Sequence, residues 1–312
     1  MRLERAARGV SLCVALAVLA LVAGCSSEPT TAGPSTPTVT VTTTVTATPT
    51  TRGSTPPTTR PPSSAAATAS ATARPAVGTV PPAWLGTRVL PRTAAGYGEI
   101  RPTPRELRDR RFTLPDTVPM LPGTGFASRV EIAPADVIAR STWVQGCPVA
   151  ASDLAWVRLT FWGFDDRRHT GELLVKASVA DQIVQVFGDL YRARFPIEEM
   201  RITTRAELTA PPTGDGNDTG SFNCRPKAGQ KTGFSQHAYG LAVDVDPFQN
   251  PYVNGSLVLP ELSSSYVDRS DVRPGMILPG GPVVRAFARI GWTWGGDWHS
   301  LKDLQHFSQN GT

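Results

Sequence analysis

The clearest hydrophobic pattern lies in residues 156–162, where Val157, Leu159 and Phe161 alternate with polar side chains. Strict alternation over this length predicts a half-buried strand. The Gly- and Asp-containing residues 163–166 predict a turn, and residues 171–175 predict a second short strand.

A different period begins after Ser178. Apolar side chains recur every three or four positions as far as Tyr191, which predicts an amphipathic helix over 179–191. Ser178 and Asp181 have the spacing of an N-terminal cap, and Phe195-Pro196 ends the helix. Three more elements are expected downstream: an extended segment at 197–202, a strand at 241–245 and an amphipathic helix at 283–290.

These strands and helices do not alternate regularly, which favours an α+β fold with a small antiparallel sheet flanked by helices over a parallel sheet. Residues 82–139 are rich in Pro, Arg and Gly and show little periodicity. We expect them to form an irregular N-terminal extension to a folded domain at 140–312.

The first 81 residues have another character. Residues 1–24 combine a basic start, a short apolar run and small residues before Cys25, which is typical of an export signal. The end of this run resembles a bacterial lipoprotein box, which implies a lipid on Cys25 and an extracytoplasmic, membrane-anchored protein. An ordinary signal peptide with an incidental cysteine is the alternative. Residues 25–81, mostly Thr, Pro, Ser and Ala, predict a disordered tether.

Charge and cysteine content narrow the function. The 312 residues carry a formal net charge of +5, and loss of the leader with its three Arg and one Glu leaves +3. That bias is too weak to suggest nucleic acid binding. In an exported protein Cys147 and Cys224 are expected to form a disulfide, with two buried free thiols as the alternative.

The first candidate site surrounds His237, one of four histidines. His237 lies in a Gly-containing turn, and Asp244 follows seven residues later within an apolar strand. Side chains two apart in a strand share a face, so Asp244 and Asp246 are both candidate ligands. A buried carboxylate requires compensation by a cation or by hydrogen-bond donors. A core histidine bonded to a backbone carbonyl is the alternative for His237.

The second candidate site combines Asp303 and His306. If this segment is helical, side chains three apart lie on one face and address one point. Two histidines and carboxylates, with one carboxylate free, suit a hydrolytic zinc site. Ser300 and Asp303 also have the spacing of a helix capping box, so a cap is the competing interpretation of Asp303.

The two stretches together resemble the zinc D-alanyl-D-alanine carboxypeptidases of the VanY type and the related phage endolysin L-alanyl-D-glutamate peptidases. The family pattern, Ser-x-His-x₆-Asp followed later by an acid-x-x-His, is met by Ser235, His237, Asp244, Asp303 and His306. The resemblance extends upstream through residues 195–201 and 217–225. It implies a zinc peptidase domain at 140–312 with the hedgehog-like fold of these enzymes.

The resemblance also implies roles. His237, Asp244 and His306 would bind Zn²⁺, and Asp303 would be the catalytic acid and base. Arg225 would act in catalysis or substrate binding, and Arg201 and Ser235 would bind substrate. The substrate would be the stem peptides of peptidoglycan, cleaved at a terminal D-alanine by a monomer. An endopeptidase of the same fold and a non-catalytic wall-binding lipoprotein are the alternatives.

The remaining candidates are less specific. Asp246 is expected to be structural or to orient a ligand, and His299 to cap a turn or support the site. His169 is expected at the surface. Trp294 and Trp298 would line a substrate groove or pack beneath the site.

Overall fold

The computed structural model describes residues 76–227 and 232–312. The chain divides into two units, Met1–Thr68 and Ala69–Thr312, and every described residue belongs to the second. The predicted leader at 1–24, the lipidation site Cys25 and most of the tether lie outside the described residues. Within residues 76–227 and 232–312, no helix combines the length and apolar character that a membrane crossing would need.

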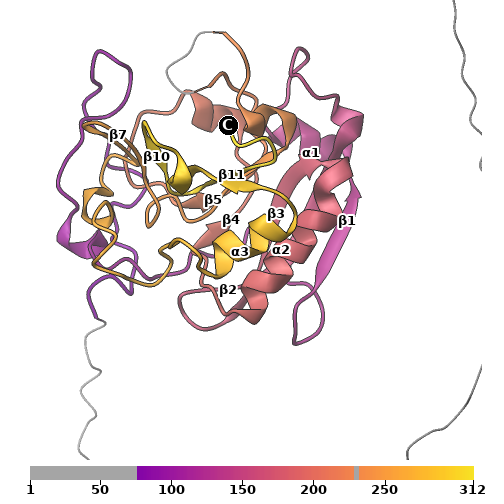
Figure 1. Ribbon diagram of the computed structural model, residues 1–312, viewed down its shortest axis with the longest axis horizontal. Helices are drawn as coiled ribbons and strands as arrows, with labels where there is room; N and C mark the ends of the chain where they lie inside the picture. The colour runs from indigo at the N-terminus through magenta and orange to yellow at the C-terminus, as the bar shows by residue number, and fades with distance from the viewer. Residues whose placement is uncertain (1–75, 228–231) are drawn as a thin grey trace, which may run out of the picture. The chain divides into compact units, whose positions relative to one another are not determined.

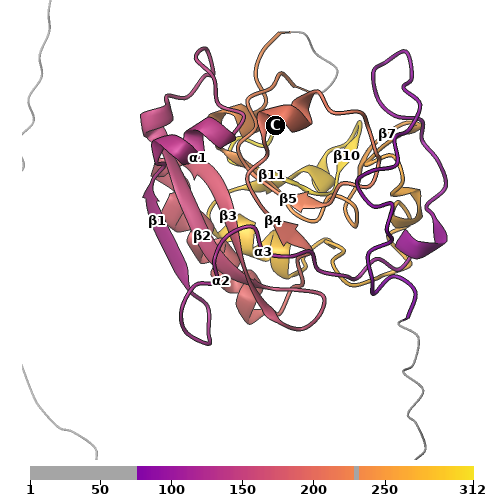
Figure 2. The same cartoon turned by 180° about the vertical axis from the view of Figure 1, so that it is seen from behind.

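The largest sheet contains β1 (Ser128–Ile132), β2 (Leu154–Trp162) and β3 (Arg168–Lys176), all antiparallel and in that order. The helix α2 (Ala180–Arg192) lies along one face of this sheet (Figures 1 and 2). The alternating apolar side chains of β2 and the apolar stripe of α2 belong to one buried cluster. Burial of these two faces is therefore what holds helix and sheet together.

The second face of the sheet is also covered, so β2 is more buried than alternation predicts. Thr160 is fully buried, and its hydroxyl accepts a hydrogen bond from the Ala127 N–H. On β3, Glu172 accepts from Arg140, at the end of α1 (Ala135–Arg140), and from the Trp156 indole. The segment before β2 folds across this face and supplies polar partners for its side chains.

The other strands are short, and three of them carry the candidate site residues Asp244, Asp303 and His306. One antiparallel sheet has the order β6 (Ala242–Asp244), β11 (His306–Ser308), β9 (Thr293–Trp294). Another has the order β10 (Lys302–Asp303), β7 (Tyr252–Asn254), β8 (Leu257–Leu259). A parallel pair joins β4 (Glu199–Met200) and β5 (Asp218–Thr219), and α3 (Pro282–Arg289) packs beside α2. The described architecture is thus α+β, with several small antiparallel sheets instead of one.

Short 3₁₀ helices complete the described structure. They span Arg105–Leu107, Ala151–Asp153, Ala177–Val179, Arg205–Leu208, Gln236–Tyr239, Ser264–Tyr266 and Gly295–Asp297.

The predicted cap of the long helix is wrong. The chain enters α2 through the 3₁₀ turn Ala177–Val179, so Ser178 lies inside that turn. Val179 is the N-cap residue, and no side chain caps the helix. The helix itself is confirmed, as is the one expected at 283–290, which matches α3.

The N-terminal extension is more structured than its composition predicts. It contributes β1 and α1, and upstream its Leu90, Leu107 and Phe112 are buried in a cluster with Phe248 and Tyr266. Figures 1 and 2 show its first part, in purple, running beside β7 on the side of the unit away from β1.

A buried ion pair ties the extension to the rest of the unit. The Arg110 guanidinium is 2% exposed and donates to both carboxylate oxygens of Glu198, at 2.7 and 2.6 Å. It also donates to the Asp215 carbonyl at 2.7 Å. These residues flank β4 and β5, so the extension supports strands close to the site.

Candidate metal centre and surrounding cavity

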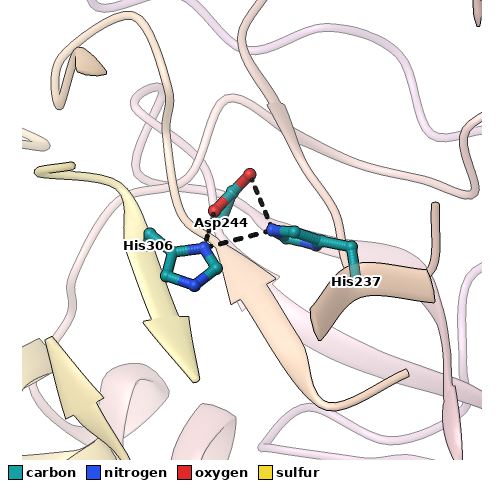
Figure 3. A group of neighbouring side chains, drawn as sticks. All are labelled: His237, Asp244 and His306. Atoms are coloured by element: carbon teal, nitrogen blue, oxygen red, sulfur yellow. Dashed lines mark hydrogen bonds and ion pairs between the residues drawn. The ribbon is translucent and has the colours of Figure 1, made fainter. Parts of the chain in front are cut away.

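Three side chains from three elements converge on one point (Figure 3). His237 comes from the 3₁₀ helix Gln236–Tyr239, Asp244 from the end of β6 and His306 from the start of β11. The His237 Nε2 atom lies 3.2 Å from both His306 Nδ1 and Asp244 Oδ2, and His306 Nδ1 lies 3.0 Å from Asp244 Oδ1.

Local sequence explains this convergence. The β6–β11 register pairs His306 directly with Asp244. Ser235 caps the 3₁₀ helix, its hydroxyl accepting from the His237 N–H at 3.4 Å. Gly240 ends this 3₁₀ helix with a φ of 66°. A Cβ atom on residue 240 would lie 2.4 Å from the main-chain nitrogen of Lys176. The turn that brings His237 back beside β6 therefore requires glycine.

The tautomer of His237 follows from its second nitrogen. His237 Nδ1 lies 2.6 Å from the Ser221 carbonyl oxygen, which can only accept a hydrogen bond. In the neutral ring Nδ1 is therefore the protonated nitrogen, which leaves the Nε2 lone pair facing the cluster. A backbone carbonyl bonded to the outer nitrogen is the usual support of a metal-binding histidine.

Charges within the cluster are strongly coupled. Burial opposes ionisation of Asp244, but the two imidazoles outweigh it and hold the pKa of this carboxyl well below its usual range. Burial likewise disfavours the charged form of His306, yet the hydrogen bond and charge of Asp244 raise the pKa of His306 above its ordinary value. Without a cation, the negative Asp244 carboxylate is thus stabilised by the two imidazoles that face it.

The donor set fits a zinc ion. Ligands of a tetrahedral ion bonded at about 2.0–2.1 Å lie roughly 3.3 Å apart. The three contacts of 3.0 to 3.2 Å between the donor atoms match that spacing. Two imidazole nitrogens and one carboxylate form a ligand set of the kind that hydrolytic zinc sites use, with a position left open.

Asp303 lines the same cavity, but its local backbone structure differs from the predicted helix. Residues 300–306 contain no helix, so neither a shared helical face with His306 nor a capping box at Ser300 exists. Asp303 ends β10, and His306 begins β11 in a different sheet. Both line the cavity because the short connection between the two strands turns there.

Asp303 has the environment of a proton-transfer group. Its Oδ1 atom is buried and has no hydrogen-bond partner among the described residues. Burial, followed by the negative charge of Asp244, raises the pKa of Asp303 to about 7. A carboxyl group with a pKa near neutrality is suited to general acid and base catalysis.

The two candidate arginines differ. Arg225 lines the cavity, and the only hydrogen bond of its guanidinium within the described part of the chain goes to the Pro226 carbonyl at 3.2 Å. Arg201 also lines the cavity, but its guanidinium contacts Glu199 at 3.1 Å and Glu207 at 2.7 Å, with Asp218 at 3.8 Å. These contacts favour Arg225 for binding substrate and leave Arg201 to hold the cavity wall.

Asp246 is not part of the cluster, although strand parity made it a candidate. The strand β6 ends at Asp244, and Asp246 has a left-handed φ of 42°. Its Oδ1 accepts from the Glu198 N–H at 3.1 Å. Burial raises the pKa of Asp246 well above its usual range. It therefore joins the buried polar layer below the site.

The remaining candidate residues, two tryptophans and two histidines, lie in different environments. Trp298 lines the cavity with its ring centroid 5.5 Å from that of His306, whereas Trp294 is buried in the core. His299 is exposed. His169 lies between Asp116 and Asp165, at 2.7 and 3.1 Å, and is only half-buried.

The cavity is large, with a volume of about 1310 Å³. Its lining includes the three-residue cluster and Asp303, residues 211–218, and Leu85 and Val89 of the N-terminal extension. A site that binds one small ligand usually has a volume of roughly 300–1,000 Å³. This cavity is large enough for a ligand of several residues.

The disulfide between Cys147 and Cys224 borders the cavity, with a Cα–Cα distance of 5.9 Å. Cys224 lies between Asn223 and Arg225, which both line the cavity. The disulfide therefore anchors this part of the wall to the segment that follows α1.

Two features of the wall were not predicted from the sequence. The Ser221 carbonyl fixes the ring of His237, and the Asn223 side chain lines the cavity. Alternation of polar and apolar side chains over residues 221–225 is the signal that would have indicated them.

Comparison with known proteins agrees with this geometry. Residues 228–309 match the M15 peptidase family model described as D-alanyl-D-alanine carboxypeptidase, and this range contains His237, Asp244, Asp303 and His306. No curated protein and no solved structure matches the chain. The segment that carries the three-residue cluster is thus similar to the M15 peptidases, which is consistent with the VanY-like pattern in the sequence.

Proposed function

We propose that this protein is a zinc-dependent peptidase that removes the terminal D-alanine from peptidoglycan stem peptides. The observation that carries the proposal is the convergence of His237, Asp244 and His306 beside Asp303, inside a segment that matches the D-alanyl-D-alanine carboxypeptidases. We extend the likeness to the hedgehog-like fold of the zinc D-alanyl-D-alanine peptidases.

The cluster residues would act as the ligands. When bound, zinc supplies a Lewis acid that polarises the peptide carbonyl and lowers the pKa of water. His237 is held by the Ser221 carbonyl with Nε2 free, and His306 is held opposite Asp244 by strand register. The protein thus presents the ligands preorganised.

Asp303 is the general base in this proposal. Its carboxylate takes the proton from the attacking water and then gives it to the nitrogen of the leaving D-alanine. Its raised pKa, about 7 before any cation is present, suits a group that must both accept and release a proton.

Arg225 would bind the carboxylate of the terminal residue. It lines the cavity and has no ion-pair partner among residues 76–227 and 232–312. A guanidinium group binds carboxylates through paired hydrogen bonds. Ser235, which also lines the cavity, would contribute mainly by capping the turn that carries His237.

One observation favours an endopeptidase as the second candidate. The cavity is also lined by Leu85 and Val89, and its volume of about 1310 Å³ is larger than a terminal dipeptide needs. An enzyme that cuts within the stem peptide would use such a groove on both sides of the bond.

The test is product analysis with the purified, zinc-loaded protein and a peptide that ends in D-Ala-D-Ala. The proposal predicts free D-alanine, its loss on chelation and its return with added zinc. Internal fragments without free D-alanine would instead support the endopeptidase. Stoichiometric zinc with no cleavage of any stem peptide would contradict both.

We further propose that the protein is exported and attached to the outer face of a bacterial membrane through a lipid on Cys25. The leader and lipoprotein box of residues 1–25 support this proposal, as does the disulfide, which is typical of oxidising compartments. A Cys25→Ser variant should fail to mature or should leave the membrane fraction. Normal maturation and membrane retention of that variant would contradict the anchor.

A further inference from the structure

Residues 221–225 form a wall of the cavity whose side chains alternate in environment. Phe222 and Cys224 pack in an apolar cluster with Leu154 and Leu174. Ser221, Asn223 and Arg225 line the cavity instead. This is the arrangement of an extended segment with one face on the core and one on the site.

The backbone of this wall is already engaged. The Asn223 N–H donates to the His237 carbonyl at 3.2 Å, and its own carbonyl accepts from the Arg225 N–H at 2.9 Å. The Cys224 N–H donates to the Thr142 hydroxyl at 2.9 Å, and its sulfur is bonded to Cys147. A ligand must therefore be recognised here by side chains.

The Asn223 side chain is the group in this wall whose hydrogen-bonding capacity no other described residue uses. Its Oδ1 atom is buried without a hydrogen-bond partner, and its Nδ2 atom has no hydrogen-bond partner within the described part of the chain. A buried amide oxygen without a partner is unusual, because leaving such an acceptor unpaired costs free energy. The main-chain hydrogen bonds above keep it beside His237 and Arg225.

We propose that Asn223 binds the main chain of the substrate peptide, with its Oδ1 accepting a hydrogen bond from a peptide N–H and its Nδ2 donating one to a carbonyl oxygen next to the scissile bond. This assignment rests on the proposed peptidase function and adds a residue outside the matched segment 228–309. A neutral donor complements a peptide carbonyl without competing with Arg225 for the terminal carboxylate.

The test uses calorimetric binding of an N-acetylated peptide ending in D-Ala-D-Ala to zinc-loaded protein carrying Asp303→Asn, which prevents turnover. Added Asn223→Ala should weaken binding by roughly fivefold to tenfold, the loss expected for one hydrogen bond. Added Asn223→Asp, with the same shape but no donor, should weaken it further because a carboxylate repels a carbonyl oxygen. Asn254→Ala, at an exposed asparagine of β7 outside the cavity, should leave binding within twofold.

Zinc content and thermal unfolding of each variant show whether the fold and metal centre are intact. If Asn223→Asp binds the peptide as tightly as the parent, or Asn223→Ala causes no loss, the assignment is wrong. Absence of peptide binding to the parent would overturn it as well. The proposed function fails separately, when the protein without Asp303→Asn binds the peptide in an Asn223-dependent way but cleaves nothing.

Discussion

At the scale of single residues, the site depends on three side chains, His237, Asp244 and His306, that converge on one point. Two imidazole nitrogens and a carboxylate meet within 3.2 Å of one another, and each is held from behind by backbone or strand register. Without a cation such a group is a coupled acid and base cluster. With one, it is a complete ligand set that leaves a position for water.

The first prediction concerns the ligands. Replacing His237 by Ala removes one of three donors, and we expect most of the zinc to be lost on dialysis. Metal analysis of the purified protein measures this, with His299→Ala as the control because that histidine is exposed. Stoichiometric zinc in His237→Ala would show that the ligand set is wrong.

At the scale of elements, long periodic segments were predictable and short ones were not. The strand at 156–162 and the helix at 179–191 extend over enough residues for their period to be recognised, and both are present as β2 and α2. The strands β10 and β11 have only two and three residues, which is too short for any period. Spacing alone therefore suggested a helix for Asp303 and His306, whereas strand pairing with distant segments determines their structure.

The same limit applies to Asp246. Strand parity placed it beside Asp244, but the strand ends at Asp244 and the backbone of Asp246 has a positive φ. This departure depends on contacts with Glu198 and Thr219, which lie far away in the sequence. The convergence of His237, Asp244 and His306 was predictable because the family pattern carries information that local periodicity does not.

An element-scale prediction concerns the turn at Gly240. Alanine at position 240 would hold a left-handed backbone conformation at a cost of about 1–2 kcal/mol. Its Cβ would also lie 2.4 Å from the main-chain nitrogen of Lys176. Gly255 provides the control, since it has φ of 58° and no atom near its virtual Cβ. Chemical denaturation should show a clearly greater loss of unfolding free energy for Gly240→Ala than for Gly255→Ala. Equal losses would mean that the turn is not constrained as described.

At the scale of the whole described unit, the N-terminal extension is part of the enzyme core and not an appendage. Its apolar residues pack with Phe248 and Tyr266, Arg110 pairs with Glu198, and Leu85 and Val89 reach the cavity. Composition could not predict this, because a Pro- and Arg-rich segment lacks a period of its own. Its contacts come from partners distributed over residues 198–266.

A prediction at this scale tests the Arg110–Glu198 pair. Replacing Arg110 by Met leaves the buried Glu198 carboxylate without its cation, which should cost about 3–5 kcal/mol of unfolding free energy near neutral pH. The exposed pair of Arg101 with Glu99 is the control, and Arg101→Met should change stability by less than about 1 kcal/mol.

The pH dependence of Arg110→Met has a defined sign. Burial already raises the pKa of Glu198, and Arg110 only partly offsets this, so its removal raises the pKa further. A carboxyl whose folded pKa is raised favours folding while protonated and loses that contribution as the pH rises. The stability deficit of Arg110→Met relative to the parent should therefore shrink as the pH falls from 8 to 5. A deficit that is constant or grows at low pH would contradict this account.

The most direct test of the central claim compares Asp303→Asn with the parent at equal zinc content, by the rate of D-alanine release from a peptide ending in D-Ala-D-Ala. Asparagine keeps the shape of the side chain but cannot accept the proton of the attacking water. We predict normal folding, undiminished zinc and a rate lower by on the order of a hundredfold or more. A zinc-loaded, folded Asp303→Asn protein that releases D-alanine at close to the parent rate would contradict the account.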